Sequence, residues 1–216
     1  MSRKIRKIEK HFKVFCEGDT EYHYIDEMKR QHKFAISLKP VNMKGGGYSN
    51  FLEHLSTDGN TNCLAKFIII DGDRAINVEG EKDNLRELLE FCNSQNKSGR
   101  IPHIVVVNYP DFEYVACLHI PKYKGQNVTQ YIINELHYRN LDEFKTDKGV
   151  YTVLNTRGNS TEIMLDALHK ENCFVIHECK IKKNEYEMKV NMIWNWEKLG
   201  RRGSNINEFF DVITSF

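Results

Sequence analysis

Three acidic residues follow apolar runs that are typical of buried β-strands. Glu17 comes after residues 12–16, and Asp71 and Asp73 come at the end of the run over residues 65–70. Short runs rich in β-branched and aromatic residues indicate strands buried on both faces of a parallel sheet. Ligands of such sheets bind beyond the carboxyl ends of the strands. If the two strands are neighbours, the three carboxylates meet at one edge of the sheet.

These carboxylates have the chemistry of a metal site. Asp71 and Asp73 are two residues apart, so both side chains would face the same side of an extended strand end. Crowded carboxylates repel one another, and hard oxygen ligands of this kind favour Mg²⁺ or Mn²⁺. Such an ion binds phosphate oxygens and stabilises the charge that develops in phosphoryl transfer. The alternative is that each acid only caps a helix or a turn.

Strand and helix patterns alternate in the first half of the chain, which favours a mostly parallel sheet covered by helices on both faces. From about Pro110 onward, helical patterns dominate. The sequence therefore predicts an α/β core over residues 1–125 and a helix-rich part over residues 126–216 packed on that core. The expected strands cover residues 12–16, 34–41, 65–73 and 101–108, and the expected helices cover residues 20–31, 49–55, 79–94, 112–119, 128–135, 160–171 and 205–213.

Composition limits the classes of protein to consider. Hydrophobic residues make up 40% of the chain, enough for a core, and the net charge of +1 means that a nucleic-acid role needs basic residues gathered on one face. The six cysteines include no Cys-x-x-Cys pair, which argues against a zinc ribbon and fits a reducing cytoplasm. The charged start lacks the apolar stretch of a signal peptide, and no segment approaches the roughly 20 apolar residues of a membrane span. We expect a soluble, cytoplasmic protein.

Three motifs resemble, in their order along the chain, those of RloB-like proteins. The first is Val-Phe-Cys-Glu-Gly-Asp-Thr-Glu at residues 14–21, and the second is the Asp-x-Asp strand at residues 68–73. The third is Asn-Tyr-Pro-Asp-Phe-Glu at residues 108–113, followed by Cys-Leu-His at residues 117–119. The core of that family is a TOPRIM domain, the fold of topoisomerases, primases and OLD-family nucleases. The resemblance covers roughly residues 12–125.

The third motif departs from the family at two places. Tyr109 stands between Asn108 and Pro110, which are adjacent in the family pattern. Tyr114 and Val115 stand where the family has an aliphatic residue followed by tryptophan. These departures affect the start of the expected helix and leave the acid of the motif in place.

The resemblance implies a TOPRIM-like, Rossmann-like fold and a role for each matched acid. Glu17 would be a metal ligand or a general acid/base, and Asp71 and Asp73 would hold the metal. Glu21 and Glu113 would be further catalytic acids or complete a second metal position. Both also fit a structural role, because a carboxylate in the first turn of a helix is stabilised by the helix dipole. His119 is expected to be a packed histidine.

The resemblance further implies a Mg²⁺- or Mn²⁺-dependent nuclease that acts on DNA or RNA in prokaryotic antiviral defence, beside an AAA- or ABC-type ATPase partner. One alternative is a non-catalytic module that binds nucleotides or nucleic acid and regulates an ATPase. Another is a purely structural partner of an ATPase. An oligomer is compatible with the sequence, and no membrane association is expected.

Basic residues that could contact nucleic acid are spread over several segments. Lys44 precedes three glycines and a helix, a pattern that can cradle phosphate through backbone N–H groups, although a flexible turn is the favoured explanation. Arg157 stands in a similar turn, where Ser160 alone would serve as a helix cap. Trp194 and Trp196 lie among the last basic residues of the chain, and such a combination can bind single-stranded DNA or RNA. The alternative is that both are core residues under a solvated face. The expected nucleic-acid-binding residues are Lys44, Arg74, Arg157, Lys182, Lys183, Arg201 and Arg202.

Overall fold

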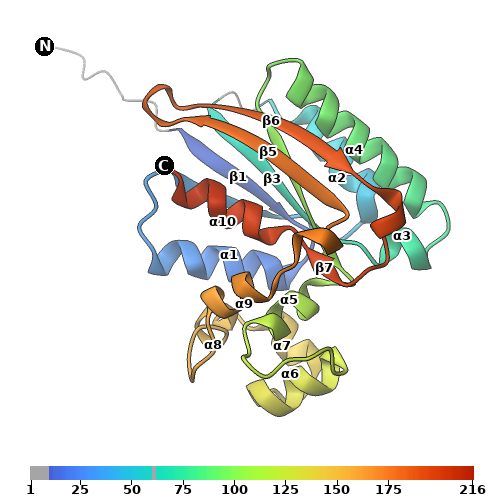
Figure 1. Cartoon of the computed structure of the whole chain (residues 1–216), viewed down its shortest axis with the longest axis vertical. Coiled ribbons are helices and arrows are strands. Elements are labelled where there is room, and N and C mark those ends of the chain that lie inside the picture. The colour runs from blue at the N-terminus through green and yellow to red at the C-terminus, as the bar shows by residue number, and fades with distance from the viewer. Residues whose placement is uncertain (1–9, 60–61) are drawn as a thin grey trace, which may run out of the picture.

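The computed structural model describes residues 10–59 and 62–216 of the chain. Its centre is a five-stranded sheet in the order β2-β1-β3-β4-β7 (Figure 1). The first four strands in this order are parallel, and β7 pairs antiparallel with the end of β4. The expected mostly parallel α/β sheet is therefore confirmed. The strands are β1 (His11–Cys16), β2 (Ser37–Asn42), β3 (Cys63–Asp71), β4 (His103–Tyr109) and β7 (Gly203–Ser204).

Helices cover both faces of this sheet because alternate strand residues point to opposite sides. Phe67 and Ile69 of β3 pack with α1 (Asp19–Gln31) and α10 (Ile206–Thr214) in one buried cluster. Ile68 and Ile70 of the same strand pack with α2 (Gly47–Thr57) and α4 (Glu81–Lys97) in a second cluster. Residues on both sides of β3 are therefore fully buried, as its continuous apolar run predicts.

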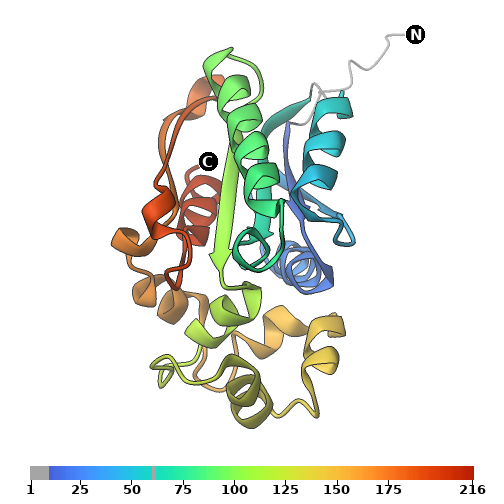
Figure 2. The same ribbon diagram turned by 90° about the vertical axis from the view of Figure 1, so that its right-hand side faces the viewer.

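Five short helices lie beyond the carboxyl ends of the parallel strands and form the lower part of the molecule in Figures 1 and 2. Two of them, α5 and α6, agree with the helices expected from the sequence, and α9 is shorter than expected. The other two, α7 and α8, have no counterpart in the prediction. The helices are α5 (Phe112–Leu118), α6 (Val128–Leu136), α7 (Leu141–Thr146), α8 (Val150–Val153) and α9 (Thr161–Ala167).

The stretch after α9 corrects the expectation of a helix-rich part through residue 216. It forms an antiparallel hairpin of β5 (Val175–Lys182) and β6 (Glu187–Trp194). Met188, Val190 and Met192 are buried, whereas the residues between them are exposed. This alternation with period two is typical of a half-buried strand, and no element was predicted for this stretch.

The last part of the chain completes the sheet that the first part begins. β7 pairs with β4, and α10 packs in the same cluster as α1. The boundary expected near residue 125 stays a prediction. The six cysteines carry free thiols, and five of them are buried. Within residues 10–59 and 62–216, no helix is long and apolar enough to cross a bilayer.

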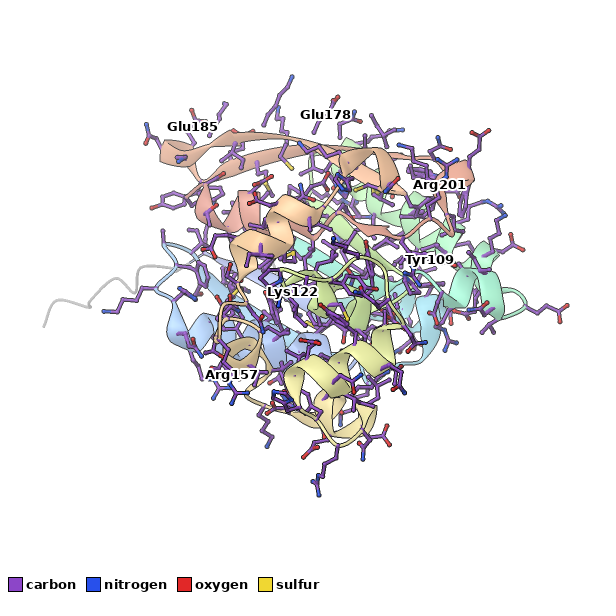
Figure 3. All side chains as sticks on the ribbon, turned by 60° about the horizontal axis from the view of Figure 1, so that its bottom comes forward. Tyr109, Lys122, Arg157, Glu178, Glu185 and Arg201 are labelled. Carbon is purple, nitrogen blue, oxygen red and sulfur yellow. The ribbon has the colours of Figure 1, made fainter. Side chains whose placement is uncertain are left out.

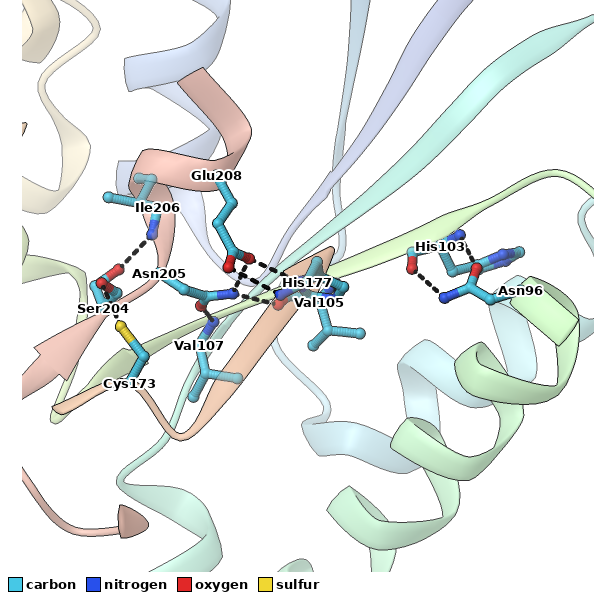
Figure 4. A network of polar contacts seen from close by, with 10 residues as sticks. All are labelled: Asn96, His103, Val105, Val107, Cys173, His177, Ser204, Asn205, Ile206 and Glu208. Atoms are coloured by element: carbon cyan, nitrogen blue, oxygen red, sulfur yellow. Dashed lines mark hydrogen bonds and ion pairs between the residues drawn. The ribbon is translucent and has the colours of Figure 1, made fainter. Parts of the chain in front are cut away.

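Side chains close the part of the β4 edge that β7 leaves open (Figure 4). The Val107 N–H donates to Asn205 Oδ1 at 2.8 Å, and Asn205 Nδ2 donates to the Val105 carbonyl at 2.9 Å. The Val105 N–H donates to His177 Nε2 at 3.2 Å, while His177 Nδ1 lies 2.6 Å from Glu208 Oε2. The side chains of Asn205, His177 and Glu208 are called the edge clamp below. Because exposed strand edges invite pairing with other chains, the edge clamp also protects the sheet.

Asn205→Ala is expected to lower the free energy of unfolding by about 2–4 kcal/mol, because it leaves a buried N–H and a buried carbonyl without partners. Chemical denaturation measures the change. The matched control is Asn207→Ala, which alters the same helix start away from the β4 edge. Equal denaturation midpoints for the two variants would show that the edge clamp adds nothing to stability.

Candidate functional site

A cavity of about 200 Å³ lies beyond the carboxyl ends of β1 and β3. Four of the acids expected at the site line it: Glu17, Glu21, Asp71 and Glu113. They come from four elements, namely the end of β1, the first turn of α1, the last residue of β3 and the first turn of α5. Lys145 of α7 also lines the cavity. This group of residues is called the acid cavity below.

The pairing of β1 with β3 brings Glu17 and Asp71 together. Cys16 lies opposite Ile69 in the parallel ladder, and the Glu17 N–H donates to the Ile69 carbonyl at 3.1 Å. The Asp71 N–H then donates to Glu17 Oε2 at 2.8 Å. The carboxylate of Glu17 thus continues the ladder by one step, which fixes its position beside Asp71.

Glu21 and Glu113 enter the acid cavity from the first turns of two helices. Each side chain is buried, with 3% of its residue surface exposed. Asp111 caps α5 by accepting a hydrogen bond from the Tyr114 N–H at 3.0 Å, which sets the position of Glu113. The helix dipole favours carboxylates at both places. A favourable helix dipole does not explain why Glu21 and Glu113 are buried next to other carboxylates.

Asp73 does not share the position of Asp71, and the expectation that both face the same side of a strand is wrong. β3 ends at Asp71, and the Gly72 N–H donates to the Asn108 carbonyl at 2.7 Å as the chain turns. Asp73 has helical backbone angles and precedes α3 (Arg74–Asn77). Its side chain is absent from the lining of the acid cavity. It acts at longer range, since its charge is one of the causes that raise the pKa of Glu17.

Burial and mutual repulsion raise the pKa of several acids in and near the cavity. Burial is the main reason that the pKa of Glu21 rises to about 8, and the charges of Glu113 and Glu17 add to it. Burial also raises the pKa of Asp71 well above its ordinary value, helped by the same neighbouring carboxylates. For Glu17, burial raises the pKa and the hydrogen bond from Asp71 opposes the rise. The pKa of Asp111 rises to about 6 through burial and the nearby Glu113.

One cation partly offsets this negative charge. Lys145 Nζ lies 3.1 Å from Glu113 Oε1. Burial alone would lower the pKa of Lys145, but Glu113, Asp111 and Asp71 outweigh it and raise the pKa. Sequence reasoning missed this residue because α7 was not expected and no spacing links Lys145 to the acids.

The donor atoms of the acid cavity suit a hard divalent cation. The four acids supply carboxylate oxygens, and among the described residues Asp71 Oδ1 is buried without a hydrogen-bond partner. A positive ion would also relieve the repulsion that helps to raise the pKa of Glu21 and Asp71. In the part of the chain that the structure describes, no three His, Cys, Asp or Glu side chains stand at metal-ligating spacing. An ion therefore requires side chains of the cavity to rotate toward it.

The glycine loop before α2 does not offer a free phosphate cradle. The start of α2 is occupied by the carboxylate of Glu81, which accepts from the Tyr48 N–H at 3.3 Å and from Arg74 Nε at 3.2 Å. Gly47 has a φ of +72°, which strains any other residue, and a Cβ there would lie 2.6 Å from Glu81 Oε2 and displace this carboxylate. Lys44 is exposed and lies with Gly18 and Asp19 around a shallow hollow.

The other basic residues expected to bind nucleic acid do not form one surface. Lys182 and Lys183 lie at the turn of the hairpin, where Lys182 pairs with Glu185 and Glu187. Arg201 and Arg157 lie on different sides of the molecule in Figure 3, and Arg202 donates to the Gly125 carbonyl. Trp196 packs near Lys82 and Arg86 of α4 and away from the hairpin turn.

His119 is a packed residue, as expected. It is fully buried; its Nδ1 donates to the Val115 carbonyl at 3.1 Å, and its Nε2 accepts from the Tyr24 hydroxyl at 3.0 Å. This bonding fixes the tautomer. Burial lowers the pKa of His119 to about 4, so the ring is neutral at physiological pH and links α5 to α1.

Comparison of the chain with models of known protein families, with curated proteins and with solved structures found no match. The functional assignment therefore depends on the motifs of the chain and on the geometry of the acid cavity.

Proposed function

We propose that the protein is a Mg²⁺- or Mn²⁺-dependent nuclease of the TOPRIM type, similar to RloB-like proteins, that cuts phosphodiester bonds of DNA or RNA. The observation that carries the proposal is the acid cavity, where carboxylates of β1, α1, β3 and α5 converge at the end of a parallel sheet. Asp71 Oδ1 is buried and has no hydrogen-bond partner in the part of the chain that the structure describes, which supports a cation as its partner. TOPRIM topology is part of this proposal, since the sheet order is compatible with a Rossmann-like fold in general.

Different residues of the cavity would bind the ion and transfer the proton. Asp71 and Glu17 would hold the ion, with Glu17 oriented by the Asp71 N–H. When bound, the ion supplies Lewis acidity toward a phosphate oxygen. Asp73, just outside the cavity, would contribute negative charge and bind the ion only after a rotation. These roles follow from the positions of the carboxylates relative to one another.

Glu21 suits general acid/base catalysis. A group with a pKa of about 8 retains its proton near neutral pH and can release it to a leaving oxygen. Glu113 would position the ammonium of Lys145, which lies 3.1 Å from it and can contact a phosphate oxygen. The residues thus provide a proton and a positive charge on the side of the cavity nearest the helices.

A second function is favoured by one specific contact. Lys145 neutralises part of the charge of Glu113, so the acids can be accommodated without a catalytic metal ion. The cavity would then not need to hydrolyse a substrate. The protein would then be a non-catalytic module that binds nucleotides or nucleic acid and regulates an AAA- or ABC-type ATPase. In either case, the resemblance to RloB-like proteins supports a role in antiviral defence.

A cleavage assay separates the two functions. Labelled DNA and RNA, single-stranded and duplex, are incubated with the protein in Mg²⁺, in Mn²⁺ or in EDTA. The nuclease proposal expects cleavage of at least one substrate with a divalent ion and none in EDTA. Ion-dependent binding without cleavage would favour the regulatory module. Cleavage that persists in EDTA would overturn the metal-dependent mechanism.

A further inference from the structure

A second hollow, of about 490 Å³, lies at the end of the sheet opposite the acid cavity. The start of β3, the loop between α4 and β4, and the turn of the hairpin line it. In Figure 1 this is the upper end of the molecule, where the turn between β5 and β6 lies near the amino ends of the parallel strands. Four cations contribute to its lining, and together they are called the cationic hollow below: Lys10, Lys97, Arg100 and Lys189.

The charge of the cationic hollow is poorly compensated. All four cationic residues are exposed. Among the residues that the structure describes, Lys97 and Arg100 have no acidic partner within ion-pair distance. Lys189 lies 3.9 Å from Glu187, the one acid in the lining, and Lys10 donates to the Tyr186 carbonyl. In contrast, Lys182, which the sequence suggested as a contact, is paired with two glutamates.

An aromatic ring lies at the rim of this hollow. Tyr186 is 49% exposed, and its ring stacks on Phe216 at a centroid distance of 6.5 Å. Lys10 Nζ lies 6.0 Å from the same ring. Cations around a hollow with an aromatic side chain at the rim are the features by which proteins bind the phosphates and bases of nucleic acids.

The two hollows are too far apart to bind the same phosphate. Cys63 of β3 lines the cationic hollow and Asp71 of the same strand lines the acid cavity. At about 3.3 Å per strand residue, these residues are about 26 Å apart. Base pairs are spaced at about 3.4 Å, so a duplex must be at least about eight base pairs long to reach both sites.

We propose that the cationic hollow binds the phosphate backbone of nucleic acid and anchors it at a distance from the acid cavity. The choice of nucleic acid as the occupant rests on the proposed function. The exposed cations are an observation that does not depend on it. An anionic membrane is a poorer fit, because the cations surround a hollow and, within residues 10–59 and 62–216, Tyr186 is the only exposed large hydrophobic residue that lines it.

The test is binding of a fluorescent duplex longer than eight base pairs, measured by anisotropy in EDTA over a range of salt concentrations. The variant Lys97→Ala/Arg100→Ala/Lys189→Ala is expected to bind at least about tenfold more weakly. The slope of the logarithm of the binding constant against the logarithm of the salt concentration should decrease in magnitude by about 0.9 for each phosphate contact removed. The matched control is Lys122→Ala/Lys124→Ala/Lys148→Ala, which removes the same charge from exposed positions on the helical part.

The outcomes separate this proposal from the nuclease proposal, because binding in EDTA requires neither an ion nor cleavage. Equal affinity of the wild type and the first triple variant would overturn the anchor site. So would an equal loss in the control variant, which would indicate a bulk charge effect. Binding to vesicles of anionic lipid with none to the duplex would overturn the choice of nucleic acid.

Discussion

Asp71→Asn is expected to reduce ion-dependent cleavage by at least about a thousandfold, since a lost metal ligand removes several kcal/mol of transition-state stabilisation and each 1.36 kcal/mol is a factor of ten. Asp71 lines the acid cavity, and one of its oxygens is buried without a hydrogen-bond partner among the residues that the structure describes. Glu17→Gln should have a similar effect, although an amide there can still accept the hydrogen bond from the Asp71 N–H. Initial rates of cleavage in Mn²⁺ measure both changes.

The Asp71→Asn variant should fold normally, which makes its loss of activity interpretable. Asparagine resembles the protonated carboxyl that burial favours at position 71, so the melting temperature of the metal-free variant should equal or exceed that of the wild type. The matched control is Asp166→Asn, an exposed acid on α9 outside the acid cavity. Cleavage by Asp71→Asn at the wild-type rate would show that this residue has no part in the chemistry.

Stability of the metal-free protein is expected to fall as the pH rises from about 4.5 to about 8. The pKa of Glu21 is near 4.5 in an unfolded chain and rises to about 8 in the folded protein, mainly through burial. A raised pKa means that the folded state holds the proton more tightly, so its stabilising effect is complete below the lower value and is lost as the pH passes the higher one. The loss attributable to this residue is on the order of a few kcal/mol.

Glu21→Gln should remove much of this dependence, because glutamine mimics the protonated acid at every pH. Denaturation midpoints in EDTA, taken below, within and above this pH range, measure the effect. Glu53→Gln, an exposed residue of α2, is the control and should retain the slope of the wild type. Mg²⁺ should oppose the loss at high pH, since carboxylates bind metals after losing their protons. A slope unchanged by Glu21→Gln would contradict the assignment of the proton to this residue.

The sequence predicted the sheet well because its strands are buried on both faces. The run that ends at Asp71 is continuously apolar, and such a run has few stable positions other than the centre of a parallel sheet. Its neighbour β1 was found for the same reason, and their pairing then placed Glu17 beside Asp71. The sequence left the pairing of these two strands as a condition, and the structure meets that condition.

Elements that depend on long-range contacts were missed. The β5-β6 hairpin carries charged residues on its exposed face, so its apolar content is low and only its period of two marks it as strand. Asp73 was misplaced because the turn at Gly72 is set by a hydrogen bond to the Asn108 carbonyl of another strand. Lys145 reaches the acid cavity through the packing of α7, a short helix without a strong pattern of its own.

Calorimetric titration with Mn²⁺ is the most direct test that the convergent acids form a metal site. The wild-type protein is expected to bind the ion and to release protons as it does so, because burial raises the pKa of Glu21 and of Asp71 in its absence. Proton release appears as a heat that changes with the ionisation enthalpy of the buffer. Absence of binding heat in every buffer, or equal binding by Asp71→Asn, would contradict the proposed site.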